Sequence, residues 1–123
     1  WQVAERGRGS QTADDLRVLL DFIGQEHSGA GEIIGLMANH SNATLRETGF
    51  SRLGWLQGDQ LHALALAGAV DVSDRVRLYC AEVLASGVAE SSDENFLREW
   101  LSKEQNALIR EQLISAVDSL RKP

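Results

Sequence analysis

The sequence contains almost no proline, and its single proline is the last of 123 residues. Because proline breaks helices, its absence from residues 1 to 122 leaves every segment of the chain free to be helical. Cysteine is equally scarce, since Cys80 stands alone. A lone cysteine excludes an internal disulfide and a zinc site made of several thiolates from this chain, and it is compatible with a reducing compartment.

Long apolar runs and clustered basic residues are also missing. No apolar stretch reaches the roughly 18 residues that a membrane span needs, and residues 1 to 12 contain no hydrophobic signal core. We therefore expect a cytoplasmic protein with no membrane partner. The twelve Lys and Arg residues are scattered, and the net charge is -6. Nucleic acids are bound by grouped basic charge, so this balance disfavours a nucleic-acid partner and favours a basic protein.

The remaining composition is that of a helical chain. Residues 1–12 are polar and without periodicity, which predicts a flexible lead-in before a single domain over residues 13–123. Thr12 with Asp15, and Ser91 with Glu94, resemble capping boxes and predict helices that begin near residues 13 and 93. Glycine and other turn-forming residues separate the remaining predicted helices from one another. The predicted helices, about seven in number, cover 13–27, 31–40, 43–56, 59–70, 74–86, 93–104 and 106–121.

An aliphatic-arginine pair recurs along the chain. Copies start at Leu16, Leu45, Val76 and Ile109, and mostly small or apolar residues follow each at offsets of four, seven and eight, on one helix face. In the last three copies these residues are Gly49, Arg52 and Leu53, then Cys80, Val83 and Leu84, then Leu113, Ala116 and Val117. The intervening helices carry Ile33, Leu36 and Met37, then Leu61, Leu64 and Ala65, then Leu97, Trp100 and Leu101. A two-helix unit recurring about every 30 residues is typical of a helical solenoid.

An Asp or Asn precedes each arginine by three or four residues, and in this the chain resembles HEAT repeats. The pairs are Asp14 with Arg17, Asn42 with Arg46, Asp74 with Arg77, and Asn106 with Arg110. The resemblance implies an all-α, right-handed solenoid of about 3.5 HEAT-like helix pairs, in which these eight residues bond along the stack. Without the family, the same pattern predicts Asp or Asn helix caps and cations that pair with them across one turn.

Residues suited to catalysis or metal binding do not cluster in the sequence. His27, His40 and His62 fall on three different predicted helices, outside any HExxH motif, so we predict no metal site and no cofactor. Cys80 and His62 are the one possible thiol-imidazole pair, but Cys80 occupies a core offset, where cysteine acts as a small hydrophobe. Carboxylates mostly have simpler roles, for example in predicted ion pairs between Glu94 and Arg98 and between Glu99 and Lys103.

One candidate binding surface emerges from the helices that would line the concave side of a solenoid. Projection at 100° per residue gives the face opposite each core stripe. These faces consist of Ala63, Leu66 and Val70 in the 59–70 helix and Asn95, Glu99 and Ser102 in the 93–104 helix. If open to solvent, they form an apolar patch with an acidic flank, which is typical of a partner site. Tight stacking that buries Leu66 and Val70 is the alternative.

Two classes of function agree with these patterns. The first is a non-enzymatic module or adaptor that binds a protein or peptide on its concave face, for example an inhibitor or immunity protein of a basic partner. The second is a small HEAT-like enzyme that resembles DNA glycosylases or pigment-attaching bilin lyases. A glycosylase needs a basic groove and a lyase needs a cavity for its ligand, whereas the predicted groove is apolar to acidic.

Overall fold

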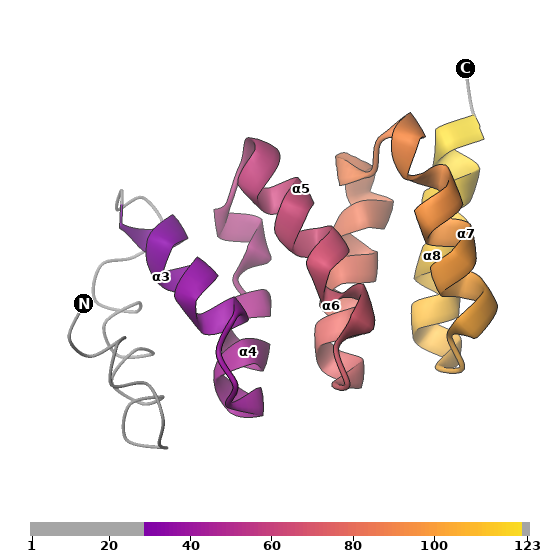
Figure 1. The fold of residues 1–123 in the computed structure, drawn as a ribbon. Helices are drawn as coiled ribbons and strands as arrows, with labels where there is room; N and C mark the ends of the chain where they lie inside the picture. The colour runs from indigo at the N-terminus through magenta and orange to yellow at the C-terminus, as the bar shows by residue number, and fades with distance from the viewer. Residues whose placement is uncertain (1–28, 122–123) are drawn as a thin grey trace. The chain divides into compact units, whose positions relative to one another are not determined.

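The structure, a computed structural model, describes residues 29–121, and the chain divides into two compact units, residues 1–56 and 57–123. Within residues 29–121 all regular elements are helical and no β-strand occurs, which confirms the all-α prediction (Figure 1). The lead-in predicted over 1–12 and the helix predicted over 13–27 lie outside the described residues. In the described part of the chain, no helix is both long enough and apolar enough to cross a membrane.

The described part of unit 1 is a helical hairpin of α3 (Ala30–Ala38) and α4 (Ala43–Phe50), followed by the 3₁₀ turn η1 (Leu53–Trp55). The two helices approach closely at Gly49. A Cβ atom on Gly49 would lie 2.9 Å from the backbone nitrogen of Ala38 and 2.9 Å from the Cβ atom of Met37. Glycine at this buried offset of the repeat therefore permits the tight packing of α3 on α4.

Unit 2 contains two further helix pairs. The first consists of α5 (Gly58–Ala67) with the 3₁₀ turn η2 (Gly68–Val70), and α6 (Asp74–Val83) with the π-helical turn η3 (Leu84–Val88). The second consists of the 3₁₀ turn η4 (Ser91–Asp93) with α7 (Glu94–Lys103), and α8 (Ala107–Arg121). Helix α8 packs against both α6 and α7, and α5 packs against α6 (Figure 1). Each of the six described α-helices overlaps one predicted range, but α4 ends at Phe50, α5 at Ala67 and α6 at Val83, earlier than predicted, because a 3₁₀ or π-helical turn follows each of them.

The capping box predicted at Ser91 and Glu94 is displaced by one residue. The N-cap is Glu90, whose side chain accepts a hydrogen bond from the backbone of Asp93. In return, Oδ2 of Asp93 accepts from the backbone N–H of Glu90 at 2.8 Å. The shift arises because a 3₁₀ turn precedes α7, so the first helical residue of this segment is Ser91.

The predicted core stripes are largely buried. Among them, the side chains with 0% exposure in unit 2 belong to Ala65, Val76, Cys80, Leu84, Leu97, Ile109, Leu113 and Ala116. Leu36 is the clear error, because it is 42% exposed. The buried face of α3 is instead formed by Ala30, Ile33, Ile34, Met37 and Ala38. This face is centred more than 100° around the helix from Leu36, so the apolar residue at that position faces away.

Candidate functional site

The three repeated arginines of the described residues share a contact within the turn that joins the two helices of each pair. Nη1 of Arg46 donates to the carbonyl oxygen of His40 at 3.3 Å. Nη1 of Arg77 donates to that of Asp71 at 2.9 Å, and Nη1 of Arg110 to that of Glu104 at 2.9 Å. Each acceptor lies six residues before its arginine. The repeated arginine therefore stabilises the interhelical turn by satisfying a carbonyl group that no helix ladder reaches.

The acid and amide positions of the repeat differ in what they bind. Oδ1 of Asn42 accepts from the N–H of Leu45 at 3.0 Å, which is the predicted cap of α4. Oδ1 of Asn106 likewise accepts from the first turn of α8, from Leu108 and Ile109. The cap predicted at Asp74 is wrong by one residue, because Ser73 Oγ caps α6 by accepting from Val76.

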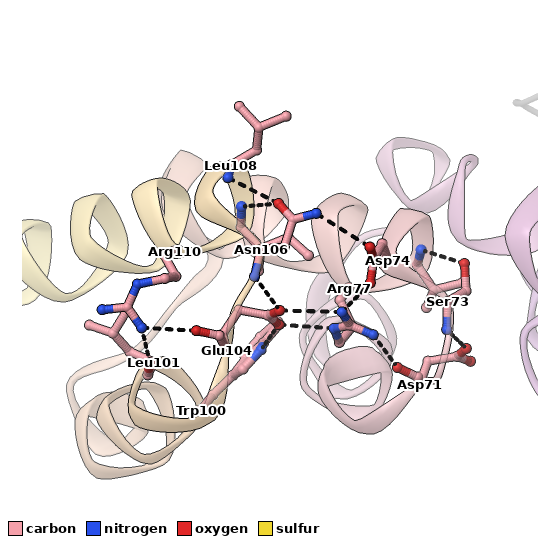
Figure 2. Close-up of polar contacts among 12 residues, drawn as sticks. Asp71, Ser73, Asp74, Arg77, Trp100, Leu101, Glu104, Asn106, Leu108 and Arg110 are labelled. Atoms are coloured by element: carbon pink, nitrogen blue, oxygen red, sulfur yellow. Dashed lines mark hydrogen bonds and ion pairs between the residues drawn. The ribbon is translucent and has the colours of Figure 1, made fainter.

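Asp74 is used instead to join neighbouring elements. Its carboxylate forms an ion pair with Arg77 in the same turn, and its Oδ2 accepts from Nδ2 of Asn106 at 3.4 Å (Figure 2). The second contact connects the beginnings of α6 and α8, which are 32 residues apart in sequence. Asp14 and Arg17, the first pair of the predicted ladder, lie outside the described residues.

Glu104 is the centre of a buried polar network in the turn between α7 and α8 (Figure 2). Its side chain is 4% exposed and accepts from Nε of Arg77 at 2.9 Å, from Nη2 of Arg77 at 3.2 Å, and from Nε1 of Trp100 at 3.0 Å. A fourth bond comes from the backbone N–H of Asn106 at 3.2 Å. Burial opposes ionisation, but these hydrogen bonds outweigh it and lower the pKa of Glu104. The carboxylate is therefore charged and fixed.

An open cleft of about 580 Å³ lies beside this network in unit 2. Its lining residues come from η2 and the turn after it, from α6, from α7 and from the turn after α7: Ala69, Val70, Asp71, Arg77, Phe96, Glu99, Trp100, Lys103, Glu104 and Gln105. Val70 is 87% exposed and Phe96 is 42% exposed. The Phe96 ring meets Trp100 edge to face, with 6.4 Å between ring centroids. The cleft therefore exposes apolar surface, and its Phe96 ring contacts Trp100, whose indole donates to Glu104.

Two of the six residues predicted for the binding surface line this cleft, namely Val70 and Glu99. Ala63, Asn95 and Ser102 are exposed outside it, and Leu66 is partly buried. The alternative that stacking buries Val70 is wrong, given its exposure of 87%. Val70 follows the end of α5 at Ala67, in the 3₁₀ turn η2, and it stays on the solvent side as the projection predicted. Sequence reasoning also missed Arg77, Trp100 and Glu104 as parts of the site.

A second polar cluster gathers around His62 on α5. Its Nε2 atom lies 2.7 Å from Oδ2 of Asp93 and 3.4 Å from Oε2 of Glu90. Asp93 is 6% exposed, and the three residues offer ligand atoms that all lie within 4.8 Å of one another. The hydrogen bond with Asp93 raises the pKa of His62 despite partial burial, and the charges of Asp93, Glu90 and Asp59 add to this effect. No local sequence pattern indicated this cluster, because His62 and Asp93 are 31 residues apart.

Cys80 is buried in unit 2 and is not paired with His62. Its Sγ donates to the carbonyl oxygen of Leu64 at 3.8 Å, whereas His62 bonds to Asp93. Burial raises the pKa of Cys80 to about 12, so the thiol stays protonated at neutral pH. The exposed pairs predicted on α7 are present, with Arg98 2.8 Å from Glu94 and Lys103 3.0 Å from Glu99.

Comparisons of the chain with protein-family models, with curated proteins and with solved structures find no match. The resemblance to HEAT repeats therefore rests on the sequence motifs alone.

Proposed function

We propose that the chain is a non-enzymatic interaction module that binds a peptide segment of a basic protein in the cleft of unit 2. The observation that carries this proposal is the exposure of Val70 and Phe96 in one open cleft that is also lined by the acidic residues Asp71 and Glu99. An inhibitor or immunity protein of a basic partner is the concrete form of such a module. The proposal includes a HEAT-like adaptor. The packing of α6 against α8, the second helices of two successive pairs, supports it.

The apolar part of the cleft favours an inserted aliphatic or aromatic side chain. Fully burying one such side chain contributes roughly 1.5–3 kcal/mol, and the exposed surfaces of Val70 and Phe96 would leave water at the same time. Phe96 is held by its contact with Trp100, and the indole of Trp100 is bonded to buried Glu104. Binding therefore orders few side chains, which lowers the entropic cost of association.

The charged part of the cleft favours a basic ligand. Glu104 and Arg77 neutralise one another in the wall, with side chains 4% and 18% exposed. Glu99 and Lys103 are paired at the surface, where they are 70% and 74% exposed. Such an exposed pair contributes little, so a Lys or Arg of the ligand can replace Lys103 beside Glu99. With Asp71, the lining of the cleft contains three acidic and two basic residues. The chain as a whole carries a net charge of -6.

The enzyme alternatives receive less support from this cleft. A glycosylase-like function needs a continuous basic channel for the nucleic-acid backbone, whereas the cleft contains three carboxylates and two cations. A lyase-like function needs an enclosed pocket around a pigment, whereas the cleft is open and Val70 at its edge is 87% exposed.

Selection from a display library of random peptides tests the proposal. We expect the selected peptides to combine an apolar side chain with Lys or Arg, and to bind more weakly as salt rises. Fluorescence anisotropy with one synthetic peptide then compares Val70→Gln with Val72→Gln. The two valines are matched, since they are 87% and 86% exposed, but only Val70 lines the cleft.

Val70→Gln should weaken binding by about tenfold or more, because one buried apolar contact is lost, and Val72→Gln should leave the Kd within about twofold. Glu99→Gln should reduce the salt dependence, with Glu111→Gln as the control carboxylate on α8. Equal effects of the two valine substitutions would place binding outside the cleft. Selection of acidic peptides would contradict the electrostatic part of the proposal.

A further inference from the structure

The cluster of His62, Glu90 and Asp93 lies outside the cleft, and it assembles ligands from two elements, α5 and the segment around η4. It combines one imidazole nitrogen with carboxylate oxygens from two residues. This mixture of nitrogen and oxygen ligands suits zinc, which binds both at roughly 2.0–2.2 Å. We propose that His62, Glu90 and Asp93 form a binding site for a divalent zinc ion.

The spacing of the ligand atoms supports this assignment. Two ligands on a tetrahedral zinc ion at roughly 2.0–2.1 Å are about 3.3 Å apart. Nε2 of His62 lies 2.7 Å from Oδ2 of Asp93 and 3.4 Å from Oε2 of Glu90. These two distances lie on either side of the separation that two ligands of one zinc ion have, about 3.3 Å. The ion would take the place of the proton that His62 and Asp93 now share.

The carboxylate ligands are held in place by the capping box described above. Oδ2 of Asp93 accepts from the backbone N–H of Glu90, and the Glu90 side chain accepts from the backbone N–H of Asp93. Each carboxylate has two oxygens, so these bonds leave acceptor positions for a metal ion. Hydrogen bonds to ligating carboxylates orient them and raise metal affinity. Asp93 is also 6% exposed, so its conformation is restricted before any ion binds.

Charge and access also favour a cation. Among the described residues, Glu90 and Asp93 form no ion pair with Lys or Arg, and their charged partner is His62. The charge of Asp59 acts on His62 as well. A divalent ion would offset this excess of negative charge. The side chains of His62 and Glu90 are 25% and 59% exposed, which gives the ion a route from solvent and leaves room for a water ligand.

Calorimetric titration of zinc chloride into the chelator-treated full chain near neutral pH tests the assignment. We expect one zinc ion per chain, with affinity that falls at acidic pH because His62 must lose its proton to bind. Glu90→Gln should weaken the Kd by at least about tenfold. Glutamine can still accept the capping hydrogen bond, so this variant tests the ligand without removing the cap.

Glu82→Gln is the matched control, because Glu82 is an exposed glutamate on α6 outside the cluster, and its Kd should stay within about twofold of the wild-type value. His62→Gln should abolish the binding of zinc in the calorimetric titration. Circular dichroism in chelator reports whether each variant is folded. The proposal is overturned if zinc gives no binding heat, or if folded Glu90→Gln binds zinc as tightly as Glu82→Gln. Peptide binding in the cleft does not depend on either outcome.

Discussion

Replacing Glu104 by glutamine should destabilise unit 2 substantially. The carboxylate accepts four hydrogen bonds while its side chain is 4% exposed, and the Arg77 side chain beside it is 18% exposed. Removing one member of such a buried pair typically costs roughly 3–5 kcal/mol, because the other charge stays buried without compensation. Glutamine keeps the volume and one acceptor oxygen, and Arg77 keeps Asp74. We therefore expect a loss near the lower limit, about 3 kcal/mol.

Urea unfolding followed by circular dichroism measures this loss, with Glu99→Gln as the control. Glu99 is a carboxylate on the same helix, paired with Lys103 but 70% exposed, so its substitution should cost less than about 1 kcal/mol. A double-mutant cycle of Glu104→Gln and Arg77→Gln should give a coupling energy above about 1 kcal/mol. If Glu104→Gln costs no more than Glu99→Gln, or if the coupling energy is near zero, the buried pair of Glu104 and Arg77 does not stabilise unit 2.

Three further predictions concern packing and pH. Gly49→Ala should destabilise the fold by roughly 1–3 kcal/mol in urea unfolding because its Cβ has no room. Gly54→Ala should be nearly neutral, since no atom lies within 4 Å of the added Cβ. Leu84→Ala should cost roughly 2–5 kcal/mol by the same assay because it leaves a cavity in the core. The hydrogen bond with Asp93 raises the pKa of His62, so protonated His62 stabilises the folded state. This contribution to the free energy of unfolding is complete below the ordinary pKa of histidine and is lost as pH rises through the raised pKa. In chelator, the unfolding temperature of His62→Gln should lack this pH dependence. If the variant keeps the pH profile of the wild-type chain, His62 is not its source.

Helix positions were predictable from the sequence because they depend on local chemistry. Asn42 caps α4, and the apolar residues at offsets of four and eight from Val76 and Ile109 are buried, as a 3.6-residue period requires. Errors arose where the backbone leaves the α-helix. The 3₁₀ turns η1 and η2 follow α4 and α5, which end earlier than predicted, and the 3₁₀ turn before α7 moved a capping box by one residue.

The polar contacts of the cleft and of the His62 cluster were harder to predict from the sequence, because they join residues that are far apart in the chain. Arg77 was identified from its repeated motif, but nothing local indicated that it would reach Glu104, 27 residues later. His62 was isolated in the sequence for the same reason, since its carboxylate partner Asp93 is 31 residues away.

The helical class, the approximate helix positions and most of the core could be predicted because each depends on residue type and on spacing within a few turns. Which polar residues meet depends on the packing of the helices. Packing of α6 and α7 against α8 brings Arg77 to Glu104, and the fold of unit 2 brings His62 to Asp93. These contacts depend on how neighbouring helices pack against one another, and the periodicity of a single helix does not determine that packing.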